Sequence, residues 1–269
     1  MSELSELSKT LFVPMGGRIF ASERFPKIFY DKKALELKRK IPREILDDRR
    51  QSEYTFLASA TRSRNVDTVI RMFLSKHKKA NIVELGCGLE TSYFRCDNGS
   101  ANWIELDLSD VIEFRRSLLP DEKRMCCLSE SILSEDIAER IAEKLKDEPT
   151  LFLASGLFHY FERDKIIVLL RRLSKIPNAG IVFDAVNSLG IKGIKKYMKQ
   201  LGRESAKMYF FCNDEKALAG EISSRAELIF SKPFYRNIDK RGMKLITRLS
   251  MRISDMFNMV KLIYIKLSQ

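Results

Sequence analysis

Cysteine and histidine are scarce in this chain of 269 residues, which contains five cysteines and two histidines. The cysteines form no C-x-x-C pair and no cluster with histidine. This pattern argues against a disulfide scaffold and against a zinc site. We therefore expect reduced thiols, no metal site and a cytoplasmic location.

Long apolar runs are also missing, since no stretch of eighteen apolar residues occurs and no membrane span is expected. The polar start, MSELSELSKT, does not have the pattern of a signal peptide. The formal net charge is +12, but the basic residues are spread along the chain with short clusters at Lys76–Lys79, Lys192–Lys199 and Lys240–Lys244. These clusters lack the interleaved aromatic residues that stack on bases. We expect solvated helix faces and no nucleic-acid partner; the alternative is contact with RNA.

Apolar segments alternate with helical patterns from about residue 80 onward, which predicts a parallel sheet with helices on both faces. Late segments add a hairpin at one sheet edge, and a basic amphipathic stretch at 243–260 either lines an acceptor pocket or packs on the surface. An irregular arm is expected at 11–37, with a helix near its end, and a link or short helix at 42–54. The predicted strands are 82–86, 103–107, 125–129, 150–155, 180–185, 226–230 and 261–267; the predicted helices are 54–79, 110–119, 134–146 (with Ser134 as N-cap), 163–175, 191–201 and 213–224.

A glycine turn follows the first of these strands. Gly86 and Gly88 allow a sharp turn at the carboxyl edge of the sheet, where ligands of open α/β folds bind. A dinucleotide fingerprint needs glycine at the sixth position, which is Thr91 here, and Glu90 would repel a pyrophosphate. A cofactor without phosphate and with a positive sulfonium suits this turn better.

Two carboxylates lie on the second strand. Asp107 follows the glycines by about twenty residues, the distance at which a carboxylate accepts hydrogen bonds from ribose. Glu105 shares a strand face with Asp107 and is a second candidate for the ribose. The alternative for Asp107 is an acidic flank for the helix that Ser109 and Asp110 begin.

The segments VELGCGLETSYFRCDNG and WIELDLSDVIEFRRSLLP resemble the core of the leucine carboxyl methyltransferase family, especially its tetracenomycin polyketide O-methyltransferase branch. The resemblance extends to Leu11–Leu37, Thr61–Arg62 and Ser155–Phe161, and it is thinnest after Asn187. It implies a class I methyltransferase fold with a seven-stranded, mostly parallel sheet and an N-terminal helical arm or lid. The implied organisation is one domain over 1–269, with the arm and helices at 1–79 and the cofactor-binding core at 80–269.

The resemblance implies S-adenosyl-L-methionine as the cofactor. Arg62 matches the family's arginine for the cofactor carboxylate, which a guanidinium binds bidentately. Two departures bear on the cofactor contacts: Ser155 stands where glutamate is frequent, and Ser134 stands where aspartate is common. We predict that the cofactor site comprises Arg62, Glu84, Gly86, Gly88, Glu105, Asp107, Glu130, Ser131 and Ser155.

Methyl transfer is an in-line displacement, so positioning supplies much of the rate. His159 and Tyr160 follow the fourth strand and are the catalytic candidates, with His159 as a base; the alternative for His159 is a packed wall residue. Arg18 on the arm and Asp184 at the end of the fifth strand are the candidates for contact with the acceptor.

Three functions are compatible with these residues. The first is an O-methyltransferase that acts on a hydroxyl or carboxylate of a small molecule, such as a polyketide. The second is a protein carboxyl methyltransferase, and the third is an inactive protein that retains an adenosine pocket. The sequence does not give the oligomeric state.

Overall fold

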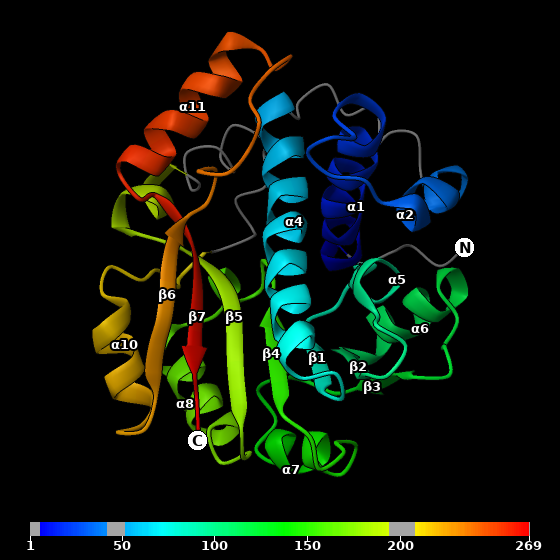
Figure 1. The fold of residues 1–269 in the computed structure, drawn as a ribbon, viewed down its shortest axis with the longest axis vertical. Coiled ribbons are helices and arrows are strands. Elements are labelled where there is room, and N and C mark those ends of the chain that lie inside the picture. Colours follow the sequence, from blue (N-terminus) through cyan, green and yellow to red (C-terminus); the bar gives the residue numbers. More distant parts are fainter. Residues whose placement is uncertain (1–5, 42–51, 194–207, 269) are drawn as a thin grey trace.

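The computed structural model describes residues 6–41, 52–193 and 208–268. Its strands form one seven-stranded sheet in the order β3-β2-β1-β4-β5-β7-β6, in which β7 runs antiparallel to both of its neighbours (Figure 1). The other pairings are parallel. The strands are β1 (Asn81–Leu85), β2 (Asn102–Asp107), β3 (Met125–Ser129), β4 (Thr150–Ala154), β5 (Ala179–Val186), β6 (Glu227–Pro233) and β7 (Val260–Lys266).

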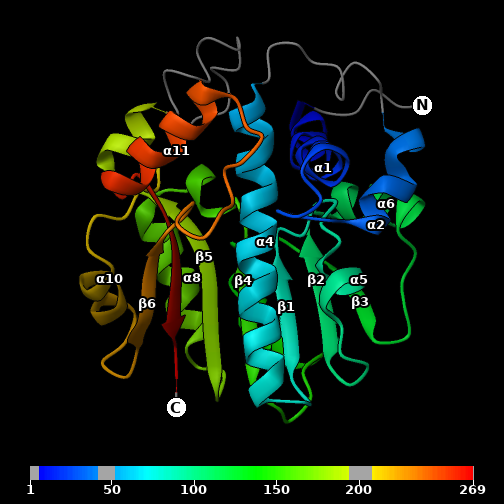
Figure 2. The same ribbon diagram turned by 45° about the horizontal axis from the view of Figure 1, so that its top comes forward.

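The helices flank this sheet on both faces (Figures 1 and 2). Every predicted strand is confirmed, and the seven-stranded, mostly parallel sheet is the one that the family resemblance implies. The helices are α1 (Glu6–Arg24), α2 (Lys32–Leu37), the 3-10 turn η1 (Lys38–Lys40), α4 (Glu53–Lys76), α5 (Ser92–Cys96), α6 (Ser109–Leu118), α7 (Ile137–Ala142), the 3-10 turn η2 (Phe158–Tyr160), α8 (Arg163–Leu173), α10 (Glu215–Ile222) and α11 (Leu245–Met256).

Side-chain alternation along the strands gives the sheet two apolar faces. On β1, Ile82 packs on the face covered by α4, whereas Val83 and Leu85 pack on the face covered by α7 and α8. Both faces are buried, which explains why the parallel strands are almost continuously apolar. The carboxyl ends of the parallel strands β1, β2 and β4 meet at one edge, where α1 lies and past which the N-terminal part of α4 extends (Figure 2).

The N-terminal arm differs from the prediction. Its first part is not irregular but is the long helix α1, which continues through Pro14. A proline inside a helix removes one hydrogen bond, so the helix must gain from packing elsewhere. Gly17 allows that packing, because a Cβ there would lie 2.7 Å from the Phe56 carbonyl oxygen and the Ser59 Cβ of α4.

The helix expected from Ser134 begins only at Ile137 and is short, because Ser134 instead donates its backbone N–H to Ser131 in a turn. The Ser134 N-cap prediction is therefore wrong. Most of the link expected at 42–54 and of the helix expected at 191–201 lies outside the described residues.

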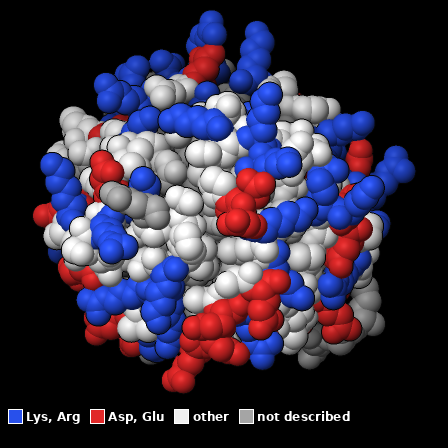
Figure 3. Space-filling view, turned by 60° about the horizontal axis from the view of Figure 1, so that its bottom comes forward, with Lys and Arg blue, Asp and Glu red and all other residues white. Residues whose placement is uncertain are grey.

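The face opposite the α1 edge carries mixed charge. Lys and Arg are spread over it and are interrupted by groups of Asp and Glu (Figure 3). On this side of the molecule, the described residues therefore form no continuous basic patch of the kind that follows a nucleic-acid backbone. The described helices include none that is long and apolar enough to cross a membrane.

Candidate active site

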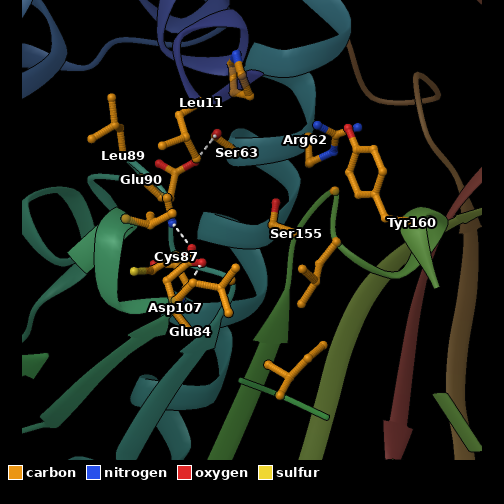
Figure 4. A pocket seen from close by; sticks show the side chains of 18 of the residues that line it. Leu11, Arg62, Ser63, Glu84, Cys87, Leu89, Glu90, Asp107, Ser155 and Tyr160 are labelled. Atoms are coloured by element: carbon orange, nitrogen blue, oxygen red, sulfur yellow. Dashed lines mark hydrogen bonds between the residues drawn. The ribbon is translucent and has the colours of Figure 1, made fainter. Parts of the chain in front are cut away.

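A cavity of about 320 Å³ lies at the carboxyl ends of β1, β2 and β4 (Figure 4). Its volume is at the lower end of the range for small-molecule and cofactor sites. Helices α1 and α4 form one wall, and the segments that follow β1, β2, β3 and β4 form the others. The lining residues are Leu11, Pro14, Arg18, Ser59, Arg62, Ser63, Glu84, Gly86, Cys87, Gly88, Leu89, Glu90, Asp107, Leu108, Val111, Glu130, Ser131, Ile132, Ser155, Gly156, Leu157, Tyr160 and Phe161.

The glycine turn forms part of the floor of this cavity. Gly86 and Gly88 have φ values of +63° and +47°, a conformation that side chains other than glycine rarely adopt. Gly88 donates its N–H to Asp107 Oδ2 at 2.8 Å, and Leu108 donates its N–H to Oδ1 at 2.8 Å. Asp107 is thereby fixed at the cavity, and its remaining acceptor positions are available to a ligand.

Glu105 does not line the cavity, which corrects its prediction as a ribose ligand. Its side chain is fully buried, and Arg115 Nη2 lies 3.4 Å from Glu105 Oε1. Glu84 is opposite Glu105 in the parallel register of β1 and β2. Unlike Glu105, Glu84 reaches the cavity lining, and it accepts a hydrogen bond from Ser92 Oγ at 2.6 Å. Burial raises the pKa of both carboxyl groups.

A substitution at Glu84 tests the effect of this burial. Burial, reinforced by the adjacent Glu105 carboxyl group, raises the pKa of Glu84 well above its ordinary value of 4.5. As the pH rises above 4.5, the Glu84 carboxyl group loses its proton in the unfolded chain but keeps it in the folded chain, so folding becomes less favourable. We expect Glu84→Gln to remove this penalty. We compare the free energy of unfolding of Glu84→Gln with that of the unsubstituted protein at each pH. The variant should gain at least about 1 kcal/mol more over the unsubstituted protein at pH 8 than at pH 4.5. Urea denaturation at the two pH values measures the difference, and an equal difference at both would contradict the raised pKa.

Arg62 lies on α4 at the opposite side of the cavity from Asp107 (Figure 4). Its Nε donates to Asp184 Oδ2 at 3.0 Å, and the guanidinium passes close to Gly156. A Cβ at Gly156 would lie 2.9 Å from Arg62 Nη1, so this position also requires glycine. Anchoring through Nε orients the terminal nitrogens, and the side chain remains one quarter exposed.

Asp184 is a fully buried anchor and does not line the cavity. Besides Arg62, it accepts the Gly156 N–H at 2.6 Å, and His159 Nε2 lies 3.2 Å from its Oδ2. Burial opposes the charge, but Arg62 and then His159 outweigh it and hold the pKa of Asp184 well below its ordinary value. The predicted contact of Asp184 with the acceptor is therefore replaced by a contact with Arg62.

His159 is likewise buried and absent from the lining, so its position does not support the predicted role as a base. It is a packed residue that pairs with Asp184, which is the alternative that its apolar neighbours suggested. Tyr160 does line the cavity and is 40% exposed. Ser155, Glu130 and Ser131 also line the cavity, and Glu130 pairs with Arg140 at 2.9 Å.

Arg18 lines the cavity, but its charge is already engaged. It lies 3.3 Å from Asp31, donates to Glu90 Oε2 at 3.0 Å and donates to the Leu89 carbonyl oxygen at 2.6 Å. These contacts fix α1 to the loop after the glycine turn. The predicted contact of Arg18 with an anionic acceptor is not what its position favours.

Arg95 is the centre of the same buried network. It contacts Asp31 at 2.7 Å, Asp67 at 2.8 Å and Glu90 at 2.8 Å. Burial disfavours ionisation of Glu90, yet Arg18 and Arg95 outweigh it and lower the pKa of Glu90 to about 2. Glu90 is therefore a structural anion of the cavity wall.

Sequence reasoning missed the apolar part of the lining, chiefly Leu11, Pro14 and Leu157. Leu157 covers the glycine turn, because a Cβ at Gly86 would lie 2.6 Å from Leu157 Cδ1. The role of Arg115, which donates to the Gly88 and Glu90 carbonyl oxygens at 3.0 and 2.7 Å, was also missed. Its only signal was its place in the family motif.

Comparisons with known proteins identify the family of this chain. Residues 8–174 match the family described as leucine carboxyl methyltransferase. The chain is 29% identical to the tetracenomycin polyketide synthesis O-methyltransferase TcmP of Streptomyces glaucescens over 185 residues, covering 68% of this chain and 67% of that protein. It is 27% identical to the S-adenosyl-L-methionine-dependent methyltransferase dpfgK of Gibberella zeae over 225 residues, covering 78% and 75%.

Solved structures share the fold at low identity. A putative methyltransferase from Thermobifida fusca superposes with a TM-score of 0.60 at 12% identity and covers 94% of each chain. A DUF574 family protein from Streptomyces avermitilis superposes with a TM-score of 0.58 at 11% identity, covering 93% of this chain and 96% of that one.

The fold, the glycine turn and the carboxylate at the end of β2 define a class I methyltransferase that uses S-adenosyl-L-methionine. Within that class, the chain belongs to the leucine carboxyl methyltransferase family. The resemblance to its tetracenomycin branch is confirmed by the similarity to TcmP.

Proposed function

We propose that this protein transfers the methyl group of S-adenosyl-L-methionine to a hydroxyl or carboxylate oxygen of a small molecule. The observation that carries the proposal is the lining of the cavity. It joins the cofactor motif to an apolar wall made by Leu11, Pro14, Leu157 and Phe161, with Tyr160 beside it. The similarity to a polyketide O-methyltransferase supports an oxygen acceptor of this kind.

The residues of the cavity fit the cofactor. Asp107, held by two backbone N–H groups, accepts hydrogen bonds from the ribose hydroxyls, and Arg62 binds the methionine carboxylate. When bound, the cofactor supplies an electrophilic methyl group on a positive sulfur. The glycine turn lets the ligand approach the backbone, Glu130 and Ser131 lie on the adenine side, and Glu84 and Ser155 complete the wall. No site role remains for Glu105.

The lining contains no histidine, and this bears on the acceptor. A carboxylate needs no base before methylation, and a phenol ionises more readily than an alcohol. We therefore favour an acceptor that loses its proton without help from the protein. Tyr160, at the rim of the cavity, is the residue that we propose contacts this acceptor.

We also propose the domain organisation, cellular location and partner of the protein. One domain spans the chain, with α1 and α4 covering a core that starts at β1. The five cysteines are free, which fits a reducing cytoplasm. The partner is a small molecule, and a nucleic acid is not expected.

Two measurements, made one after the other, test the proposed function. Calorimetry with S-adenosyl-L-methionine should detect binding, and transfer of a labelled methyl group to a panel of phenols and carboxylic acids should identify the acceptor class. Binding without turnover over the whole panel would favour the inactive adenosine-pocket protein. Label recovered in protein rather than in small molecules would favour the protein carboxyl methyltransferase.

Arg62→Lys is expected to weaken cofactor binding roughly 5- to 30-fold, because an ammonium group cannot reproduce the guanidinium fork. Isothermal titration with S-adenosyl-L-methionine measures the change. Arg64→Lys, on the same helix but outside the cavity lining, is the matched control and should bind normally. Equal affinity of the two variants would remove Arg62 from the cofactor site.

A further inference from the structure

Helix α11 exposes most of its apolar side chains, since Met251 is the one apolar side chain that it buries, beside the polar Thr247 and Ser254. Leu245, Ile246 and Met256 are 78%, 67% and 68% exposed. At a helical period these side chains cluster on the outward face, which we call the α11 stripe. The α11 stripe consists of Leu245, Ile246, Leu249, Ile253, Met256 and the adjoining Phe257.

The inward face of α11 carries Thr247, Met251 and Ser254, which are buried. Two hydrogen bonds fix the orientation of this face. Asp255 Oδ1 accepts the Tyr235 N–H at 2.8 Å, and the Lys244 N–H donates to Glu53 Oε1 of α4 at 2.8 Å. The exposure of the α11 stripe is therefore built into the fold. The sequence left open whether this stretch lines an acceptor pocket or packs on the surface. Helix α11 does not line the cavity, so it is a surface helix.

Basic residues border the stripe. Lys244, Arg248 and Arg252 are the charged residues of the helix and its N-cap apart from Asp255, which faces Tyr235. Lys244 and Arg252 are exposed. An apolar face flanked by lysine and arginine is typical of helices that lie in the surface of an anionic membrane.

Helix α11 lies on the side of the molecule that holds the cavity. The helix lies beside the N-terminal end of α4, on the side of the molecule where the parallel strands end (Figures 1 and 2). The loop after β5 adjoins its C-terminus, because Asn187 Nδ2 donates to the Phe257 carbonyl oxygen at 2.8 Å. Leu189, in the helical segment that follows Asn187, is 52% exposed and adds to the apolar surface.

We propose that the α11 stripe binds the surface of a membrane that contains anionic lipid. The apolar side chains enter the interface and the basic flank pairs with lipid headgroups. A second copy of the chain is the competing occupant, but a helix of 12 residues is only about 18 Å long. One such face covers a few hundred Å² at most, which is below the roughly 800 Å² per partner of a stable dimer.

Vesicle sedimentation tests the proposal. The protein should sediment with vesicles of phosphatidylcholine mixed with phosphatidylglycerol, and much less with phosphatidylcholine alone. Raising the salt concentration should weaken the binding. Arg248→Gln together with Arg252→Gln should reduce the partition coefficient roughly 30-fold. Ile246→Ser together with Leu249→Ser should reduce it by at least about 10-fold.

Val168→Ser on α8, an exposed apolar position away from α11, is the control and should leave sedimentation unchanged. Calorimetry with S-adenosyl-L-methionine should show that every variant retains a folded cofactor site. Absence of binding to both vesicle types would overturn the proposal. So would light scattering that shows a dimer which the Ile246→Ser and Leu249→Ser variant dissociates, because a second copy would then be the occupant.

Discussion

Arg95→Met is expected to destabilise the protein by about 3–5 kcal/mol, the cost of removing one partner from a buried ionic cluster. The substitution leaves the carboxylates of Asp31, Asp67 and Glu90 without the guanidinium that joins them. Their side chains are at most 13% exposed, so water cannot replace the lost donors. Urea denaturation at neutral pH measures the loss.

Arg116→Met provides the matched control. Arg116 pairs with Asp121 at 2.9 Å, but both side chains are more than 40% exposed. An exposed pair contributes about 0–1 kcal/mol, so this variant should remain close to the unsubstituted protein. If the two variants lost similar stability, the cluster around Arg95 would not be the link that fixes α1 and α4 to the loop after the glycine turn.

Asp107→Ala is expected to weaken S-adenosyl-L-methionine binding by about 1–3 kcal/mol, which is roughly 5- to 150-fold. The ribose hydroxyls lose a charged acceptor. In addition, the N–H groups of Gly88 and Leu108 lose the carboxylate that orders the turn. Titration calorimetry gives the dissociation constant, and urea denaturation shows whether the fold itself is affected.

A second substitution separates these two causes. Asp107→Asn retains a carbonyl oxygen that accepts one backbone N–H but loses the negative charge that the ribose contacts. We expect an affinity between those of Asp107→Ala and the unsubstituted protein. Asp110→Ala, in the first turn of α6, should bind normally because that side chain lies outside the cavity lining. Unchanged affinity in Asp107→Ala would remove this residue from the site.

The parts of the fold that local sequence determines were predicted well. All seven strands are confirmed, and the buried parallel strands among them are short apolar runs between turn residues. The positions of Gly86, Gly88 and Asp107 at the cavity follow from the rule that the carboxyl edge of the sheet binds ligands. The local pattern predicted an irregular arm at 11–37, whereas the resemblance implied a helical arm, and α1 is helical. The local prediction failed because the packing of α1 against α4 compensates for Pro14, and no local pattern records that contact.

The incorrect site predictions have a common physical origin. Glu105 shares a face with Asp107, but two residues along a strand place it about 7 Å deeper in the sheet. Arg18 and Asp184 gain their partners from segments far away in the sequence, at Glu90 and Arg62. A titratable residue near a strand end can face the ligand itself, or it can bind another residue that faces the ligand. Only the tertiary contacts distinguish these two cases.

The location of β7 between β5 and β6 has a consequence for biosynthesis. The edge of β5 remains unpaired until residues 260–266 have left the ribosome, although β5 itself ends at Val186. An exposed strand edge can pair with another chain. The nascent protein therefore passes through a stage at which it is prone to aggregate, and shielding by a chaperone would improve its yield during rapid synthesis.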